Sequence, residues 1–397
     1  MKLFFSIVLA SLVHAGYVVQ RGAVCHVHAS NDSSDDAPAI LSAFDRCGQG
    51  GTVVLNDELY HIESVMNTTG LQDVLVDLSG TMLWGTNLTY WRANGLPLGY
   101  QNMTTAWMFG GDRVVFRGHG VGTFDGNGQL WYDLTNGVSN LPGRPISLMI
   151  TNTTNSLFSG IRFVQSQFWT MAIKNSEDVL LEGIMPRRAT QTGVDTFFSN
   201  RITFRNWTVT GGDDNISMKA NSTNILIQDS VFHGGLGVAI GSIGQYPGVF
   251  ERIENVTAER VTCLGTRYAG YIKTWTGVQQ GYPPNGGGGG LGYAKNITFR
   301  DFVLQDLTDS VAHITQCTSF SGAAGGCDTS LFQISDVTWA SSVGNVASGY
   351  LAKLQCSGAA PCTGIRFGEF DSIATSGTSR TISCSNVLDP VGFNCTT

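Results

Sequence analysis

SEDVLLEGI at Ser176–Ile184, SNRITFRNW at Ser199–Trp207 and STNILIQDS at Ser222–Ser230 carry one repeated pattern. A Ser opens each stretch, and apolar and polar residues then alternate, as they do along a half-buried β-strand. NSLFSGIRF, FERIENVTA and AKNITFRDF follow the same pattern. The apolar runs of the six stretches begin, in chain order, at Phe158, Val179, Ile202, Ile225, Ile253 and Ile297.

The spacing of these runs indicates a solenoid. From Phe158, the steps to the next four run starts are 21, 23, 23 and 28 residues. Self-similarity at such a period is typical of repeat proteins, and the β-branched residues within the runs indicate strands rather than helices. One step is long enough for a full coil of three short strands and their turns. We therefore predict an all-β protein, a right-handed parallel β-helix.

The composition agrees with this fold. Gly accounts for 50 of the 397 residues, Pro for only 10, and charged residues for 13%. Many turns need Gly, whereas strands stacked on one another need few charges. The length alone would allow two domains, but the repeats continue without a linker-like stretch. We predict one elongated domain over residues 16–397.

The first residues, MKLFFSIVLASLVHAGY, have the features of a cleaved secretory signal. Lys2 precedes a short apolar run, and small residues follow near Ala15. The run is too short to span a membrane. A buried first strand is the alternative reading. We expect a signal peptide over residues 1–15 and a secreted, extracellular protein.

The nine cysteines suggest an oxidising compartment. Spacing does not determine connectivity, so the pairs are proposals: Cys25 with Cys47, Cys317 with Cys327, Cys356 with Cys362, and Cys384 with Cys395. Cys263 is left over, and we expect it to be a buried thiol. Eleven Asn-x-Ser/Thr sequons also agree with a secreted glycoprotein, among them Asn67, Asn87, Asn152, Asn255 and Asn296.

Charge and residue spacing argue against several classes of partner. The formal net charge is −7 and no basic cluster is present, so we expect no nucleic-acid binding. No Cys/His spacing resembles a zinc site, so we expect no metal and no cofactor. We further expect no membrane association and a monomer.

Gly212-Asp213-Asp214 is the strongest candidate for chemistry. Glycosidic hydrolysis commonly uses one carboxylic acid to protonate the leaving oxygen and a second carboxylate to act on water or on the sugar. Neighbouring residues of a regular strand face opposite sides, so both acids reach one cleft only if the backbone bends. Gly211 and Gly212 permit that bend. An Asp-rich turn that caps a strand is the alternative.

The segment from Gly193 to Lys273 resembles the polygalacturonase family, glycoside hydrolase family 28. That family carries Asn-Thr-Asp, Gly-Asp-Asp, Gly-His-Gly and Arg-Ile-Lys in this order. Here the second is intact, the third appears as Gly235-Leu236-Gly237 and the fourth as Tyr271-Ile272-Lys273. Order and spacing fit over most of the chain. The resemblance implies a right-handed parallel β-helix that hydrolyses pectin.

Further stretches are similar to the fungal exo-acting branch, which includes exo-rhamnogalacturonases, galacturonidases and α-L-rhamnosidases. They lie at Gly120–Asp133, Pro142–Pro145, Ser166–Thr170 and Gly281–Ala294. We interpret the last as a loop at the rim of a cleft, because it lacks the Lys-Ser/Thr of a phosphate loop.

The resemblance implies roles for three residues. Asp213 would be the proton donor, Asp214 a partner that helps to activate the water, and Lys273 a contact for the sugar beside the scissile bond. The reaction would be a single displacement with inversion.

One departure from the family pattern removes a carboxylate. The first catalytic Asp falls at Thr192, which can hold a water but cannot act as a base at neutral pH. The preceding segment, Met185–Thr192, also looks shorter than the family's loop. We keep Asp195 as a catalytic candidate that could replace the missing acid; a structural turn residue is its alternative. A count of 23 residues per coil places Thr190 to Thr192 beside Asp213.

Two further departures concern recognition and the environment of the acid. Leu236 stands where the family has His, and it would desolvate Asp213 and favour its protonated form. Tyr271 replaces an Arg that would pair with a galacturonate carboxylate, so a neutral deoxysugar such as rhamnose becomes plausible. Arg267 could restore the charge if its loop folds inward. Tyr246 and Trp275 are our candidates for sugar stacking.

These features together predict a secreted, exo-acting, inverting pectin hydrolase that removes terminal rhamnose or galacturonate from rhamnogalacturonan or polygalacturonan. A catalytically impaired β-helix that binds pectin fragments is the alternative, and it follows from Thr192 and Leu236. A pectate lyase is a weaker third reading, because the acids follow the hydrolase pattern.

Overall fold

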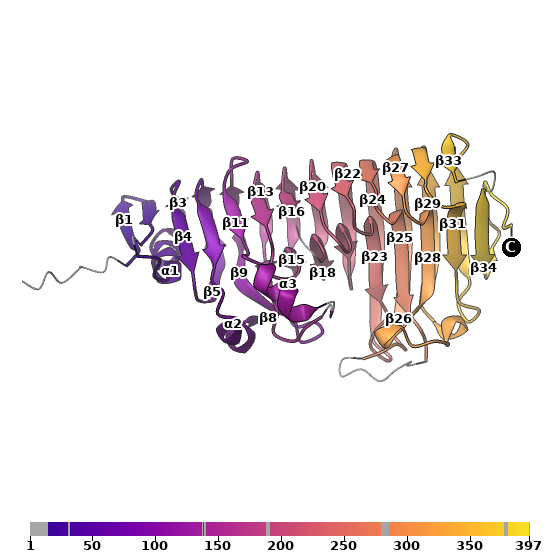
Figure 1. Ribbon diagram of the computed structural model, residues 1–397, viewed down its shortest axis with the longest axis horizontal. Coiled ribbons are helices and arrows are strands. Elements are labelled where there is room, and N and C mark those ends of the chain that lie inside the picture. The colour runs from indigo at the N-terminus through magenta and orange to yellow at the C-terminus, as the bar shows by residue number, and fades with distance from the viewer. Residues whose placement is uncertain are drawn as a thin grey trace, which may run out of the picture.

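A computed structural model describes residues 15–30, 32–136, 138, 140–187, 191–278, 286–376 and 380–396. The chain winds into one long parallel β-helix, with coils stacked in sequence order from end to end (Figure 1). The expected signal peptide lies almost wholly outside the described residues. Within the described part, no helix combines the length and the apolar character needed to cross a lipid bilayer.

The first face of the β-helix carries the strands that matter most for function. Each strand pairs in parallel with the equivalent strand of the next coil. The strands are β5 (Met66–Gln72), β9 (Thr104–Asp112), β12 (Pro145–Thr151), β15 (Met171–Lys174), β18 (Val194–Phe197), β21 (Ile216–Met218), β23 (Val238–Ile243), β25 (Tyr268–Trp275), β28 (Ser310–Thr318), β31 (Tyr350–Gln355) and β34 (Thr381–Ser385).

The second face holds the repeat seen in the sequence. Its strands are β3 (Thr52–Leu55), β6 (Leu75–Leu78), β10 (Val115–Arg117), β13 (Thr154–Ser159), β16 (Glu177–Glu182), β19 (Asn200–Arg205), β22 (Ser222–His233), β24 (Phe250–Leu264), β26 (Leu291–Arg300), β29 (Gln333–Ala340), β32 (Cys362–Gly368) and β35 (Val387–Leu388). The third face holds β4 (Leu59–Ile62), β7 (Thr81–Trp84), β11 (Thr123–Asp125), β14 (Arg162–Val164), β17 (Met185–Arg187), β20 (Thr208–Thr210), β27 (Val303–Leu307), β30 (Val343–Val346) and β33 (Ile373–Thr375). Three faces per coil agree with the predicted architecture.

The register corrects two of the run starts. Val179, Ile202 and Ile225 do stack on one another, but Phe158 pairs with Leu181 and Ile253 with Ser222. The true stack runs through Ser156, Val179, Ile202, Ile225, Val256, Ile297, Val337 and Ile365. Its steps are 23, 23, 23, 31, 41, 40 and 28 residues, because later coils carry inserted loops. Phe158 is two residues from the stack position Ser156, and alternation conceals this shift because both side chains point inward. Ile253 is three residues from the stack position Val256, and the left-handed Asn255 lies between them.

A left-handed residue bends most strands of the second face just before the stack position. The residue immediately before the stack position has positive φ in coil after coil: Asn155, Asp178, Arg201, Asn224, Asn255, Asn296 and Asp336. Asn and Asp tolerate this conformation better than most residues. The side chain of Asn255 also donates to Asn224, and that of Asn296 donates to Asn255. The polar residues ahead of each run in the sequence thus make the bend.

Both ends of the β-helix are covered. The antiparallel pair β1 (Tyr17–Arg21) and β2 (Val24–His28) lies at the first end with α1 (Ala37–Cys47). The Cys25–Cys47 disulfide joins β2 to α1, and Cys384–Cys395 closes the last coil. The other two predicted disulfides are present, and Cys263 is a buried free thiol, as expected.

The sequons do not all lie at the surface. Asn67, Asn87, Asn152, Asn255 and Asn296 are exposed, so attachment of glycans to them stays a prediction. Asn215, which also lies in a sequon, is fully buried. Its side chain is hydrogen-bonded to Gly234 and Gly237, so this sequon is not accessible.

The inward stack gives a test of the corrected register. Ile225 is buried in the stack, whereas its neighbour Leu226 points to the outer side and is only half-buried. We expect Ile225→Ala to lower the free energy of unfolding by about 2–5 kcal/mol and Leu226→Ala by clearly less. Urea denaturation measures both. Equal losses would contradict the register.

Candidate active site

Outward-facing residues of the first face bring the candidate side chains together. The register aligns Asp195 of β18, Ser217 of β21, Ala239 of β23 and Tyr271 of β25 in one row. Their neighbours along each strand, such as Val194, face the core. Asp213 and Asp214 precede β21, so they lie at the edge of this row. Residues far apart in the sequence therefore meet because their coils are stacked.

Backbone contacts show which coils flank the two acids. The amide of Gly193 donates to the Asp214 carbonyl oxygen (2.9 Å), and the amide of Leu236 donates to that of Asp213 (2.9 Å). Extending the Val194–Ile216 pairing back by two residues aligns Thr192 with Asp214 rather than with Asp213. Thr192 is buried, and residues 188–190 of the altered Met185–Thr192 segment lie outside the described residues.

Asp214 is held on all sides. Its Oδ1 accepts from the Tyr271 hydroxyl and from Lys273 Nζ (3.2 Å), and its Oδ2 accepts from Lys273 Nζ (3.0 Å) and Lys219 Nζ (3.4 Å). The side chain is 2% exposed. Burial alone would raise the pKa of Asp214, but the charges of Lys273 and Lys219 lower it to about 2. Asp214 is therefore ionised across the useful pH range.

Lys219 links Asp214 to a second buried carboxylate. Its Nζ lies 3.2 Å from Asp195 Oδ1 and donates to the Gly241 carbonyl oxygen at 2.7 Å. Burial would lower the pKa of Lys219, but Asp195 and Asp214 outweigh it and raise the pKa. Burial raises the pKa of Asp195 to about 6 against the lowering effect of Lys219. Three carboxylates and two ammonium groups thus gather here.

Asp195 lies too deep for direct contact with a substrate. Its side chain is fully buried, and its ion-pair partner Lys219 is itself nearly buried. The expectation that Asp195 replaces the missing acid therefore meets a steric obstacle. A positioning role through Lys219 fits its burial better.

Asp213 is the more accessible acid. It is half-buried, and its Oδ1 accepts the amide of Asp214 at 2.8 Å. Burial raises the pKa of Asp213, and the negative charge of Asp214 raises it further. The adjacent acids therefore have opposite pKa shifts, as an acid and its ionised partner require.

The loop that carries Leu236 is fixed by one amide side chain. Asn215 Nδ2 donates to the Gly234 carbonyl oxygen (3.2 Å), and the Gly237 amide donates to Asn215 Oδ1 (2.8 Å). Gly235 and Gly237 have positive φ, which favours Gly at both places. Leu236 then packs against Tyr268 and Tyr271. An apolar surface therefore adjoins the two acids.

The other predicted contact residues are spread around the site. Arg267 is 54% exposed, pairs with Asp309 (3.3 Å) and lies over the ring of Tyr268 (5.2 Å). It does not replace the family Arg beside Asp214, because Tyr271 fills that position. Tyr246 is half-buried. Trp275 is 7% exposed and therefore offers little ring surface for stacking in this conformation.

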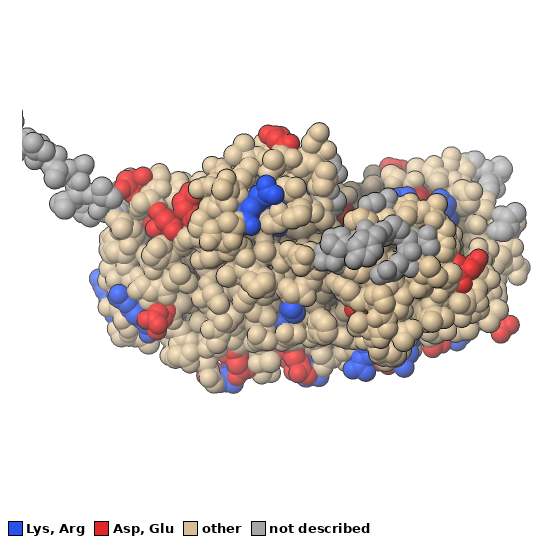
Figure 2. Space-filling model, turned by 90° about the horizontal axis from the view of Figure 1, so that it is seen from below, with Lys and Arg blue, Asp and Glu red and all other residues tan. Residues whose placement is uncertain are grey.

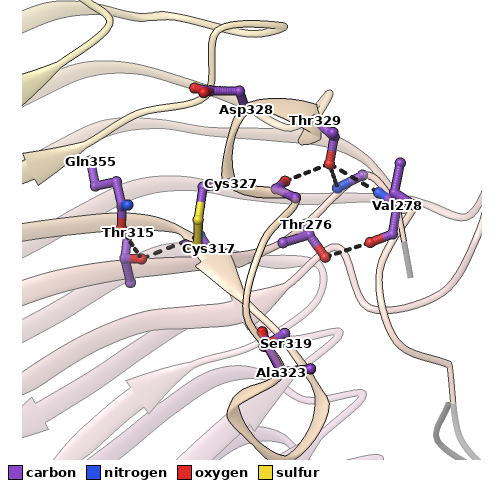
Figure 3. The surroundings of a disulfide bond; sticks show 12 residues. Thr276, Val278, Thr315, Cys317, Ser319, Ala323, Cys327, Asp328, Thr329 and Gln355 are labelled. Carbon is purple, nitrogen blue, oxygen red and sulfur yellow. Dashed lines mark hydrogen bonds between the residues drawn. A yellow bond between two sulfur atoms is a disulfide. The ribbon is translucent and has the colours of Figure 1, made fainter. Parts of the chain in front are cut away.

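The rim beyond β25 is built from loops that hold one another. Thr329 Oγ1 accepts the amides of Gly277 (3.0 Å) and Val278 (3.1 Å), next to the Cys317–Cys327 disulfide (Figure 3). The amides of Gly287 and Gly288 donate to the Gln245 carbonyl oxygen. Residues 286–288 of the Gly281–Ala294 stretch thus lie along the loop that carries Gln245. Residues 281–285 lie outside the described residues.

Three stretches typical of the exo-acting branch pack together on the other side of the site. The Tyr132 hydroxyl of α3 (Gln129–Thr135) donates to the Ser166 carbonyl oxygen (2.8 Å). Arg144 lies over the rings of Tyr132 and Phe168. Figure 1 shows α2 (Leu88–Asn94), α3 and β8 (Leu96–Pro97) on one long side of the β-helix. Figure 2 views this side, where charged groups are sparse over most of the surface.

The segment after β8 closes this end of the site. Lys174 of β15 donates to the Leu98 carbonyl oxygen, and Tyr100 packs on Phe197 of β18 (4.9 Å). Gln101 Nε2 then donates to Gln245 Oε1 (2.7 Å), across 144 residues of sequence. Pro97, residues 99–104 and Tyr246 line a hollow of about 580 Å³. The segment therefore runs past the C-terminal ends of β15 and β18 to the end of β23.

Sequence reasoning missed the central ammonium group and the end wall. Lys219 has a signal: it lies two residues after Ser217, on the side of the strand that Asp195 also faces. The bridge from Gln101 to Gln245 has no signal, because it joins two loops. Among the described residues, no group of three or more His, Cys, Asp or Glu is placed to hold a metal ion.

The buried ion cluster predicts a large cost for removing Lys219. Lys219→Met leaves Asp195 without its counter-charge, and we expect the free energy of unfolding to fall by about 3–5 kcal/mol. The double variant Lys219→Met, Asp195→Asn removes both charges and should regain most of this stability. Urea denaturation measures the three proteins.

An exposed ion pair serves as the control for this prediction. Lys295 is 38% exposed and pairs with Glu254 at 3.1 Å. Lys295→Met should cost less than about 1 kcal/mol. Equal losses for Lys219→Met and Lys295→Met would contradict the assignment of a buried, coupled cluster.

Comparisons with known proteins agree with the geometry. The sequence model described as Glycosyl hydrolases family 28 matches residues 63–395. The Aspergillus niger protein "Alpha-L-rhamnosidase rgxB" is 46% identical over 384 residues, which cover 94% of this chain and 90% of that protein. "Exopolygalacturonase X-1" of Emericella nidulans is 34% identical, over 96% of this chain and 90% of that protein.

Solved structures support the fold. The endo-xylogalacturonan hydrolase from Aspergillus tubingensis superposes with a TM-score of 0.80 at 23% identity, covering 94% of this chain and 99% of that one. The polygalacturonase from Erwinia carotovora gives 0.67 at 18% identity, over 94% and 96%. The predicted right-handed parallel β-helix is thereby confirmed. This chain belongs to glycoside hydrolase family 28 and is a glycoside hydrolase.

Proposed function

We propose that this chain is a secreted, exo-acting hydrolase that removes terminal α-L-rhamnose from rhamnogalacturonan with inversion. The contact between Tyr271 and Asp214 carries the choice of sugar. The proposal treats the chain as a monomer that needs no cofactor. The alternative of a catalytically impaired pectin binder gains no support from relatives, which carry enzyme names.

Asp213 is the proposed general acid. Burial and the charge of Asp214 raise the pKa of Asp213, which extends its protonated form to higher pH, and its half-buried side chain is accessible to a substrate. In the reaction Asp213 gives its proton to the glycosidic oxygen as the bond to the terminal sugar breaks. A water attacks from the opposite face of the sugar, which inverts the anomeric carbon.

The ionised Asp214 is the proposed partner for that water. Its four contacts already occupy about all of the acceptor positions of a carboxylate. An incoming water must therefore displace one donor. Lys273 is 20% exposed, whereas the Lys219 side chain is 7% exposed and Tyr271 is 3% exposed, so Lys273 is the donor most able to move. Once Lys273 has moved, Asp214 accepts the proton that the attacking water loses, and Lys273 contacts the adjoining sugar hydroxyl.

A neutral deoxysugar suits this site better than galacturonate. Both ammonium groups are already engaged by Asp195 and Asp214, and Tyr271 brings a hydroxyl where a cation would pair with a sugar carboxylate. Leu236, Tyr268, Tyr271 and Ala239 form an apolar cluster beside the acids that fits the methyl group of rhamnose. The relative at 46% identity carries the name of an α-L-rhamnosidase.

The contact between Gln101 and Gln245 supports exo action. In this proposal residues 97–104 form the wall at which the polymer ends. The terminal sugar would then lie against this wall, near Tyr246, and the rest of the chain would leave toward β25 and β28. Trp275 remains a proposed contact only if the rim opens.

Product analysis tests the proposal. The purified protein, incubated with rhamnogalacturonan oligosaccharides that end in rhamnose, should release rhamnose alone, without internal fragments. Polygalacturonan oligomers should yield little product. Asp213→Asn should lose nearly all turnover with little loss of stability, since a general acid contributes about 100-fold or more. Release of galacturonate, internal cleavage or no product would each overturn the proposal.

The opposite pKa shifts predict a pH range of activity that is bounded by the pKa values of the two acids. Activity requires protonated Asp213 and ionised Asp214. It should therefore decline as the pH rises through the raised pKa of Asp213, and on the acid side only near pH 2, where Asp214 gains a proton. Initial rates of rhamnose release across this range give the profile. A rate that shows no decline on the alkaline side would contradict the assignment of Asp213.

A further inference from the structure

We infer that Arg267 and Lys353, held by Asp309 on either side, form a subsite for an acidic sugar next to the cleavage point, on the side of the leaving chain. The inference rests on the proposed function, because it places the leaving chain over β25 to β31. It adds a requirement: the terminal rhamnose should be attached to galacturonate, not merely to any acceptor.

The backbone places this group in line with the acid. The Leu236 amide donates to the Asp213 carbonyl oxygen, and the Arg267 amide donates to that of Gly235 (2.8 Å). The Asp309 amide in turn donates to the Arg267 carbonyl oxygen (3.1 Å). Arg267 is therefore two coils beyond Asp213, at about 10 Å given the spacing of parallel strands. This distance suits the sugar that leaves rather than the terminal one.

A stack of rings orients the guanidinium group. Arg267 lies over Tyr268 (5.2 Å), whose ring lies 4.8 Å from Tyr271 and stacks on His313 (4.5 Å). Tyr271 contacts Asp214, so the stack runs without interruption from the catalytic acids to Arg267. An arginine held flat on an aromatic ring keeps its edge available for a carboxylate.

The ion-paired group of Arg267, Lys353 and Asp309 has an excess of positive charge. Asp309 pairs with Arg267 (3.3 Å) and with Lys353 (2.7 Å). Burial lowers the pKa of His313 to about 4, so it adds no charge near neutral pH. By contrast, Arg113, Arg201 and Arg260 each contact two acids. A local surplus of one positive charge thus stands in a protein of net charge −7.

Both cations are accessible to a ligand. The side chain of Arg267 is 54% exposed and that of Lys353 is 35% exposed, whereas Asp309 is 14% exposed. Lys353 also lies over the ring of Tyr350 (4.4 Å), which limits its freedom. A galacturonate carboxylate would meet the two cations from the cleft while Asp309 holds them from below. Rhamnogalacturonan supplies such a carboxylate beside each rhamnose.

The test compares two substrates that differ only in charge. One is a rhamnose-terminated rhamnogalacturonan oligosaccharide, and the other is the same compound with its carboxyl groups reduced to alcohols. For Arg267→Gln we expect KM for the acidic substrate to rise about fivefold with kcat little changed, the size of an exposed charged contact. KM for the reduced substrate should not change. Lys353→Met should likewise raise KM for the acidic substrate and leave KM for the reduced substrate unchanged.

Arg260→Gln is the matched control, because Arg260 is 48% exposed and pairs with Asp229 between strands β24 and β22 of the second face, whereas the acids precede β21 of the first face. It should leave both KM values unchanged. Added salt should reduce the preference of the wild type for the acidic substrate. Equal KM for the two substrates in the wild type, or an unchanged preference in Arg267→Gln, would overturn the subsite.

A binding experiment separates this outcome from failure of the proposed function. If the wild type releases no rhamnose from either substrate, the function is wrong. Calorimetric titration of the acidic oligosaccharide into Asp213→Asn reads the subsite without turnover. Adding Arg267→Gln to this variant should weaken binding about fivefold. Equal binding affinities of the two variants for the acidic oligosaccharide would refute the subsite, whichever bond the enzyme cleaves.

Discussion

The parallel register between coils is the constraint on which the site depends. Each residue of one coil has a fixed partner in the next, about 4.8 Å away, so a change of one residue would turn every side chain to the opposite face. Asp195, Ser217, Ala239 and Tyr271 share an outward row only because this register holds. The loops inserted in later coils lengthen the repeat but leave the rows intact. Chemistry can therefore be assembled from residues that the sequence separates widely.

Within this frame the acids differ because of their surroundings. Asp213 and Asp214 are neighbours in sequence, yet Lys273, Lys219 and Tyr271 surround only the second. With Asp213 protonated, Asp195 and Asp214 balance the two lysines at pH values above the pKa of Asp195, which is about 6. Neutrality of a buried group of this kind avoids the cost of an unpaired charge. Below that pH Asp195 gains a proton, so the cluster becomes positive while Asp214 stays ionised.

The sequence predicted the fold and placed the central acids by motif, whereas it could only propose the four disulfide pairs that the structure contains. Alternating residues at a repeated spacing predicted the coils, although apolar alternation could not distinguish Phe158 from Ser156 as the stack position. Motif order located Asp214, Tyr271 and Lys273, which the structure brings into contact. Lys219 was missed because it belongs to none of the quoted motifs. Contacts between loops, such as Gln101 with Gln245, depend on side-chain packing at large sequence separation and leave no periodic trace.

The wall at the end of the first face has a consequence for how this enzyme can change. Its bridge is a single hydrogen bond between neutral amides, worth about 1 kcal/mol. The wall is also packed on its floor, because Leu98, Tyr100 and Met103 share one apolar cluster with first-face residues such as Ala172 and Phe197. Substitutions at Gln101 or Gln245 can therefore open the bridge at little cost in stability, whereas substitutions at the packed residues would also disturb the strands that carry the carboxylates. A change in the mode of attack is most accessible at the bridge itself.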